Sequence, residues 1–244
     1  MELGLAASGA LAPPGATPTI DPNPRRIADF ATLGEALDYA AQGLRGLNFH
    51  DARGTLVKTY PYSELREAAL ANAHRLIGLG LKPGDRLALI AETGPEFAAA
   101  FFGAVYAGVW PVPLPLPTSF GGREAYVEQL KVMLTSSDPA LFLFPAEIAE
   151  FAGAAAAQLG IASRQWETLP EIALVAAALP TVGTDEIAYL QYSSGSTRFP
   201  HGVAVTHHAL LDNLRAHGVG LEMLESDRVV SWLPWYHDMG LVGC

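Results

Sequence analysis

Residues 86–116 of this chain, RLALIAETGPEFAAAFFGAVYAGVWPVPLPL, decide its fold class. The segment opens with Arg86 to Ala91, a short apolar run of the kind found in buried parallel strands. A helix start follows, for which we expect Thr93 as the N-cap and Glu96 as the partner in a capping box. A second extended run begins at Trp110, where each proline biases its predecessor away from helix. Strand, helix and strand in this order indicate an α/β unit.

The same order continues on both sides of this segment. Helical apolar spacing predicts helices over residues 31–45, 63–79, 123–134 and 146–159. A hairpin is expected over residues 46–59, a turn at 82–85, a further buried strand at 140–144, and a connecting region with a short helix over 160–184. The fold class predicted from this alternation is α/β, with largely parallel sheets covered by helices on both faces.

Composition excludes several classes of protein. Half of the 244 residues are hydrophobic, 16% are charged, and the net charge is −10, which is a globular and acidic composition. Nucleic-acid binding needs a basic stripe to neutralise phosphates, so we expect none. The three lysines are Lys58, Lys82 and Lys131. A polyphosphate bound after residue 131 must therefore be held by backbone N–H groups, hydroxyls, arginine, histidine or a metal ion.

Location is predicted from the cysteine count and the apolar runs. One cysteine, Cys244, fits a reducing cytoplasm. The first 20 residues carry no Lys or Arg, so the basic start of a signal peptide is missing. The apolar run from Phe97 to Val112 is too short for a membrane span. We expect a cytoplasmic protein with no transmembrane segment and a flexible lead-in over residues 1–28.

A cluster of hydroxyl side chains carries the first chemical signal. The apolar strand predicted at Ile187 to Tyr192 leads into Ser193-Ser194-Gly195-Ser196-Thr197, and a second predicted strand follows at Gly202 to Val205. Such a loop offers several N–H and O–H donors to one small anion, as a phosphate cradle does. Serine-rich turns are also common surface loops, and the residues alone leave both interpretations open.

The second signal lies close to the end of the chain. A helix is predicted from Thr206 to about His217, and a strand from Val229 to Leu233. His237 follows in an aromatic setting, where a histidine is more often packed or capping than catalytic. Three neighbouring aromatic side chains are interpreted as core: Trp232, Trp235 and Tyr236.

Both signals match one family. Residues 191–203, QYSSGSTRFPHGV, resemble the phosphate-loop motif of adenylate-forming enzymes, usually Tyr-Thr-Ser-Gly-[Ser/Thr]-Thr-Gly-x-Pro-Lys-Gly-Val. Residues 231–241, SWLPWYHDMGL, resemble the next motif in the form typical of the fatty acyl-AMP ligase branch. Residues 101–109, FFGAVYAGV, with their proline-rich exit, also look like that branch. The resemblance covers roughly residues 30 to 244.

The resemblance implies a reaction and a set of site residues. A fatty acid carboxylate attacks the α-phosphate of ATP, pyrophosphate leaves, and the acyl group passes to an acyl carrier protein. His237 is the implied catalytic residue, beside the carboxylate and the α-phosphate. The implied ATP-binding residues are Ser193, Ser194, Gly195, Ser196, Thr197, Arg198 and His201. Mg²⁺ is the implied counter-ion for the phosphates, with no protein ligand assigned to it.

Two residues depart from the family pattern. Arg198 stands where the loop usually has its second glycine, and His201 stands where it has lysine. An imidazole is mostly neutral at pH 7, so His201 supplies less charge than lysine. Arg198 either compensates, if its side chain turns toward the loop, or obstructs the loop, and the two alternatives predict opposite effects on ATP affinity.

The chain is expected to contain two subdomains, and two alternative functions stay open. Residues 29–184 are predicted to form the first α/β subdomain, and residues 185–244 the truncated start of a second one. The chain alone is expected to be inactive and, because apolar surface is left uncovered, to self-associate. The alternatives are an acyl-CoA synthetase of the same superfamily and a non-catalytic binding remnant.

Other motifs are weak. His207, His208 and His217 share one predicted helix and are interpreted as a solvated or N-terminal helix face. Cys244 has no obvious partner base, and a Gly-x-Ser-x-Gly elbow is absent from the sequence.

Overall fold

The computed structural model describes residues 21–117, 122–193 and 201–243. The helices are α1 (Leu33–Ala40), α2 (Tyr62–Gly78), α3 (Pro95–Tyr106), α4 (Gly122–Ser137), α5 (Ala149–Leu159), α6 (His207–Gly220) and α7 (Asp238–Leu241), with 3-10 turns η1 (Ala146–Ile148) and η2 (Trp166–Glu171). The strands are β1 (Gly46–His50), β2 (Leu56–Pro61), β3 (Arg86–Ile90), β4 (Trp110–Leu114), β5 (Leu141–Phe144), β6 (Ser163–Gln165), β7 (Ile187–Ser193) and β8 (His201–Thr206).

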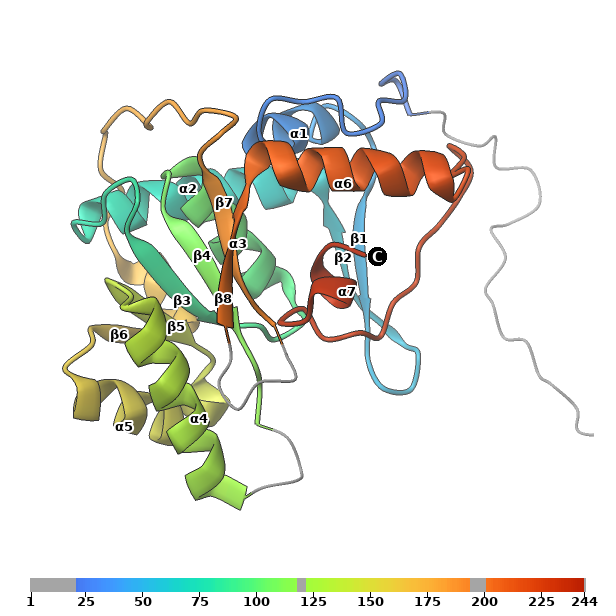
Figure 1. The fold of residues 1–244 in the computed structure, drawn as a ribbon. Coiled ribbons are helices and arrows are strands. Elements are labelled where there is room, and N and C mark those ends of the chain that lie inside the picture. The colour runs from blue at the N-terminus through green and yellow to red at the C-terminus, as the bar shows by residue number, and fades with distance from the viewer. Residues whose placement is uncertain (1–20, 118–121, 194–200, 244) are drawn as a thin grey trace, which may run out of the picture.

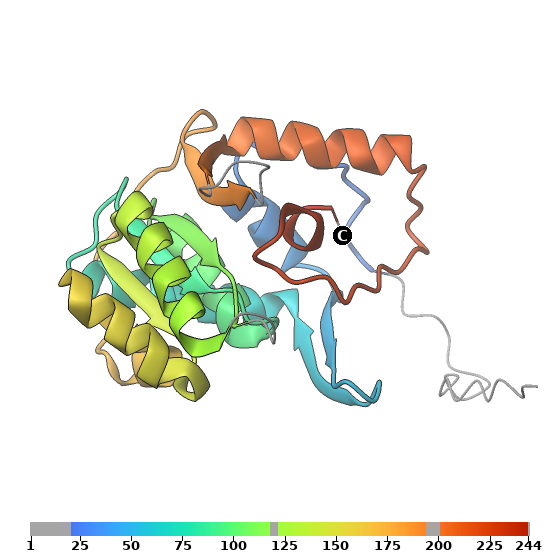
Figure 2. The same ribbon diagram turned by 60° about the horizontal axis from the view of Figure 1, so that its bottom comes forward.

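A parallel sheet of four strands forms the centre of the molecule, in the order β4-β3-β5-β6. The chain steps from β3 to β4 in one direction and from β4 across to β5 in the other. Because parallel crossovers are right-handed, α3 and α4 must cover opposite faces. Figures 1 and 2 show this arrangement, with α4 and α5 on one face and α2 and α3 packed together on the other. The predicted α/β class is confirmed.

Two antiparallel hairpins flank this sheet. The hairpin β1–β2 packs beside α2, where Leu37, Tyr60, Leu65 and Ala69 are buried in a small cluster of their own. The hairpin β7–β8 lies with β7 beside β4, and α6 leaves its end as a long helix across the molecule. The chain then returns through residues 221–237 to α7 (Figure 1).

Three local predictions are wrong. The strand predicted over 229–233 is absent: these residues are irregular and pair with no strand in the part of the chain that the structure describes. The N-cap of α3 is Gly94 and not Thr93, because Pro95 is already the first helical residue. Ser63 lies inside α2, which starts one residue earlier, directly after Pro61.

The sequence predicts no transmembrane segment, and the helices of the structure bear on this prediction. Within the described ranges, no helix combines the length and the apolar character that crossing a bilayer requires.

Candidate functional site

The hairpin β7–β8 brings the two ends of the hydroxyl-rich loop together. The backbones of Ser193 and His201 pair across the hairpin, so residues 194–200 connect two adjacent strand ends. Ser194, Gly195, Ser196, Thr197 and Arg198 lie outside the described residues. The strand–loop–strand order predicted from the sequence is therefore confirmed on both flanks of the loop.

The segment that carries His237 is a tight turn leading into α7. The His237 N–H donates to the Pro234 carbonyl at 3.1 Å, and the Gly240 N–H donates to the His237 carbonyl at 3.0 Å. A Cβ on Gly240 would stand 2.3 Å from the Pro234 carbonyl oxygen. Only glycine fits so close an approach of two backbones, so this residue shapes the turn that displays His237.

Asp238 sets the orientation of the His237 ring. The Nδ1 atom of His237 lies 2.6 Å from Oδ1 of Asp238 and 3.2 Å from the Met239 N–H. One nitrogen cannot both donate and accept, and the Met239 N–H has a shorter partner in Asp238 Oδ1 at 2.8 Å. We infer that Nδ1 carries the proton and donates to the carboxylate. Nε2 is then the ring atom available for chemistry.

Trp235 holds this turn against the rest of the molecule. Its ring lies 5.6 Å from Phe97 of α3 and 5.9 Å from Phe49 of β1, centroid to centroid. The core interpretation is right for Trp235, and Tyr236 is half-buried against the main core. It is wrong for Trp232, whose exposed fraction is 89%, because the irregular segment around it packs against nothing in the described part of the chain.

Gln191 joins the loop hairpin to the His237 turn. Its Nε2 donates to the Tyr236 carbonyl at 2.7 Å and lies 3.3 Å from the Tyr192 carbonyl. The sequence motifs around residues 193 and 237 therefore lie side by side in space. Sequence reasoning assigned Gln191 no role. The available signal was a polar residue inside an otherwise apolar strand.

Buried aromatic side chains surround this junction. Burial, aided by the negative charge of Asp238, raises the pKa of Tyr189 to about 12, so its hydroxyl stays protonated. The Tyr192 hydroxyl donates to the Met133 carbonyl of α4 at 3.1 Å. These contacts seat β7 on the central sheet and fix the base of the loop.

The helix α6 begins with a buried histidine. His207 is 1% exposed, and its Nδ1 accepts a hydrogen bond from the Leu33 N–H at 3.1 Å. Burial lowers the pKa of this side chain. His207 is the first residue of α6, so the N-terminal interpretation is right for it, but the solvated one is wrong, because the side chain is buried and ties α6 to the start of α1. The solvated interpretation is right for His208 and His217, which are exposed.

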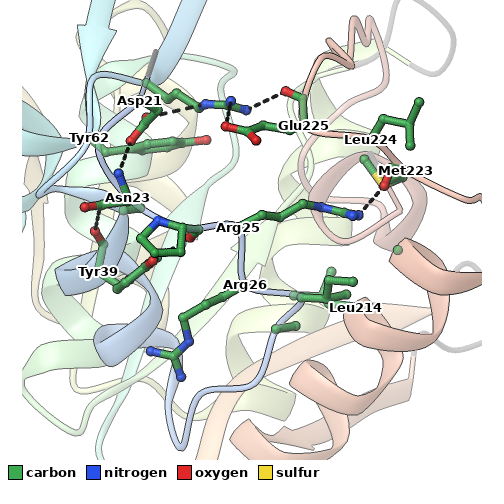
Figure 3. A pocket seen from close by; sticks show the side chains of 16 residues that line it. Asp21, Asn23, Arg25, Arg26, Tyr39, Tyr62, Leu214, Met223, Leu224 and Glu225 are labelled. Carbon is green, nitrogen blue, oxygen red and sulfur yellow. Dashed lines mark hydrogen bonds and ion pairs between the residues drawn. The ribbon is translucent and has the colours of Figure 1, made fainter.

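A cavity of about 350 Å³ lies away from these residues, between the segment 21–28, α1, α6 and residues 223–225 (Figure 3). Arg25 donates to the Met223 carbonyl, and Arg45 pairs with Glu225 at 3.2 Å and with Asp21 at 3.4 Å. Arg25 and Arg45, which line the cavity, thus bind other groups of the protein. None of the predicted site residues lines the cavity.

Fold and site together define an α/β domain in which a hairpin carrying a hydroxyl-rich segment lies beside a histidine turn. A model of the AMP-binding enzyme family matches residues 41–244. The chain belongs to this family.

Several relatives share most of this chain. A protein of Caulobacter vibrioides named "Putative acyl-CoA synthetase" is 46% identical over 229 residues, which are 93% of this chain and 40% of the relative. The long-chain-fatty-acid–AMP ligase FadD32 of Mycolicibacterium smegmatis is 36% identical over 208 residues, 81% of this chain and 31% of the relative. The chain thus spans less than half of the length of these relatives.

Solved structures agree with this assignment. A structure from a study of fatty acyl-adenylate ligases of E. coli and L. pneumophila has a TM-score of 0.86 and 44% identity, covering 90% of this chain and 40% of that one. A fatty acyl-adenylate ligase of L. pneumophila, in complex with acyl adenylate and pyrophosphate, has a TM-score of 0.75 and 28% identity, covering 91% and 38%.

Proposed function

We propose that this chain is the N-terminal part of a fatty acyl-AMP ligase, which joins a fatty acid to ATP as acyl-AMP and releases pyrophosphate. The observation that carries the proposal is the 2.7 Å hydrogen bond between Gln191 and the Tyr236 carbonyl. It brings the strand that opens the hydroxyl-rich loop next to the turn that carries His237. A reaction between a carboxylate and a phosphate needs the groups that hold each of them at one place.

The loop would hold the β- and γ-phosphates. Its residues 193–197 offer four hydroxyls and a glycine, a donor set that fits a polyphosphate. Arg198 and His201 stand at the end of the loop and would add positive charge and N–H donors. This assignment rests on residue chemistry and on the paired strand ends of the hairpin.

His237 would act beside the carboxylate and the α-phosphate. With Nδ1 donating to Asp238, its Nε2 is presented as the free ring nitrogen of an oriented imidazole. In its protonated form the ring would donate from Nε2 to an oxygen on which charge develops as the new P–O bond forms. Asp238 would keep the direction of that ring fixed.

Mg²⁺ would neutralise phosphate charge during the transfer. Among the described residues, no group of three or more His, Cys, Asp or Glu side chains has the geometry of a metal site.

The acceptor of the acyl group is proposed to be an acyl carrier protein. Support comes from the relatives named as fatty acid–AMP ligases and from the form of residues 234–241. The second candidate is an acyl-CoA synthetase, favoured by the name of the Caulobacter relative. The two differ in whether CoA consumes the acyl-AMP. The third candidate, a non-catalytic binding remnant, is favoured by the departures at Arg198 and His201.

The remaining expectations are part of the proposal. Residues 1–28 serve as a lead-in, 29–184 form the first subdomain and 185–244 begin the second, within a cytoplasmic enzyme. The 244 residues alone neither complete adenylation nor stay monomeric. Exposed apolar side chains from Val219 to Trp232 support self-association, and a monodisperse monomer in light scattering would count against it.

Product analysis tests the proposal. The protein in its full natural length is incubated with ATP, Mg²⁺ and labelled fatty acids, with CoA, with acyl carrier protein, or with neither. Acyl-AMP that persists with CoA and is consumed by the carrier protein supports the ligase, whereas acyl-CoA supports the second candidate.

A second experiment tests the two residues that depart from the family pattern. The double substitution Arg198→Gly, His201→Lys restores the family pattern and should raise ATP turnover in an active enzyme. If neither the natural protein nor this variant forms an adenylate with any acid, the non-catalytic candidate stands.

A further inference from the structure

The side chain of Gln191 is buried in a way that core packing does not explain. It is 6% exposed and sits in β7 among apolar residues. Its Oε1 atom is fully buried and has no hydrogen-bond partner among the described residues. An amide with one orphaned atom costs free energy that an apolar side chain of similar size would not. Its contribution must therefore come from the donor end.

The donor end makes two hydrogen bonds, and the shorter one acts on the peptide group that precedes His237. Nε2 donates to the carbonyl of Tyr236, and that carbonyl belongs to the peptide bond whose N–H is that of His237. The same N–H donates to the Pro234 carbonyl. Because a peptide group is planar, holding its oxygen on one side and its N–H on the other fixes the plane from which His237 projects.

The two sides of the turn are held by different forces. Trp235 packs its ring against Phe49 of β1 and Phe97 of α3. In the part of the chain that the structure describes, the amide of Gln191 makes the one side-chain hydrogen bond between β7 and residues 234–243. A packed ring limits how far the turn moves, but a directional hydrogen bond sets its rotation.

We propose that Gln191 is a positioning residue, which locks the Tyr236–His237 peptide and thereby fixes the direction in which the His237 imidazole projects. The role in catalysis rests on the proposed function. The lock itself is a property of this chain and is testable without activity. Gln191 touches no reacting atom in this scheme, so its removal should affect the rate of the chemical step more than the binding of ATP.

The test uses three variants of the protein in its full natural length. Gln191→Met keeps the length of the side chain and removes the donor. Gln191→Glu keeps the shape, and its buried carboxyl, with a pKa raised by burial, donates only while it is protonated. Tyr192→Phe is the matched control, because it removes a buried hydrogen bond from the same strand, to Met133, without touching the turn.

Hydrogen exchange followed by mass spectrometry measures the lock directly. Gln191→Met should speed exchange of the amides in residues 236–242 by about fivefold or more. Tyr192→Phe should leave that segment at the wild-type rate. For Gln191→Glu, the exchange rate of residues 236–242 divided by the wild-type rate should stay near one at low pH. It should rise toward the value for Gln191→Met as the carboxyl ionises. Unchanged exchange of residues 236–242 in Gln191→Met overturns the proposal.

Kinetics then tests the consequence for the reaction. Gln191→Met should lower kcat for adenylation by about 10- to 100-fold, with a smaller change in the KM for ATP. A raised KM with unchanged kcat overturns the positioning role. If the wild-type protein forms no acyl-AMP, the proposed function fails, while the exchange experiment still decides whether Gln191 locks the turn.

Discussion

Two apolar stretches of this protein have opposite surroundings. In the central sheet, Leu89 and Phe142 are completely buried between helices on both faces. In the segment that follows α6, Val230 is 86% exposed and Trp232 is 89% exposed. Both stretches are rich in Val, Leu and aromatic residues, and the sequence predicted a strand in each of them.

The difference teaches what a strand needs. β3 has β4 on one side and β5 on the other, so its backbone is paired along both edges. Residues 229–233 pair with no other strand within the described ranges. An extended run without a neighbour leaves its N–H and C=O groups to water and has no face to bury. Apolar composition is therefore not sufficient for a strand.

The largest expected effect is a cavity in the central sheet. Phe142→Ala should lower the free energy of unfolding by about 3–5 kcal/mol, because the ring is completely buried and packs edge-on against Phe144, with 5.1 Å between the ring centroids. Val230→Ala in the exposed stretch should change it by less than about 0.5 kcal/mol. Urea unfolding of the 244-residue chain measures both. Equal losses would mean that the exposed stretch is packed in solution, and the contrast between the regions would fail.

A second test concerns how closely the helices of the buried region approach. A Cβ on Gly103 of α3 would stand 2.7 Å from Asn72 Cβ and 3.0 Å from the Ala69 carbonyl oxygen, both on α2. Gly103→Ala should therefore cost about 1–3 kcal/mol by forcing the helices apart. The matched control is Gly153→Ala in α5, where the new atom meets only Phe144 at 3.8 Å. That control should gain about 0.5–1 kcal/mol from helix propensity. A stabilising Gly103→Ala would show that the two helices are not in tight contact.

A third test compares two tryptophans three residues apart. Trp235→Ala should cost about 1–2 kcal/mol, because its ring packs on Phe49 and Phe97 while remaining partly exposed. Trp232→Ala should leave the free energy of unfolding nearly unchanged. Thermal unfolding of the two variants side by side checks the difference. A larger loss for Trp232 would place the border between the two regions elsewhere.

The smallest expected effect is a dependence of stability on pH through His207. Its pKa in the folded state is lowered, chiefly by burial and against the charge of Glu186. The stability that the neutral ring contributes is complete above the unfolded pKa of about 6.5 and is lost as the pH falls through the lower folded pKa. His207→Asn retains an acceptor for the Leu33 N–H and removes this titration. The urea midpoint of unfolding is measured at pH values on both sides of ~6.5. It should change less with pH in the variant than in the wild-type protein. Identical slopes would remove His207 as the cause.

Sequence reasoning found most of the helices and strands, and it predicted the place of the site. The strands at residues 86–90 and 141–144 and the hairpin around residue 53 lie where local apolar runs and turn residues predict them. The helix caps were harder to predict, because Thr93 and Gly94 are both acceptable N-caps and Pro95 decided between them through its fixed φ. Gln191 and His207 were missed because their partners are distant in sequence, at Tyr236 and Leu33.

By itself, the sequence determined the α/β class, the hydroxyl-rich loop between two strands, and the family to which the chain belongs. These depend on periodicity, turn chemistry and short motifs, which neighbouring residues carry. Only the tertiary structure decided which apolar residues are buried, which histidine is an internal tie, and that the loop hairpin and the His237 turn share one hydrogen bond. Burial and pairing depend on what a distant part of the chain places opposite each residue, and local sequence does not specify that partner.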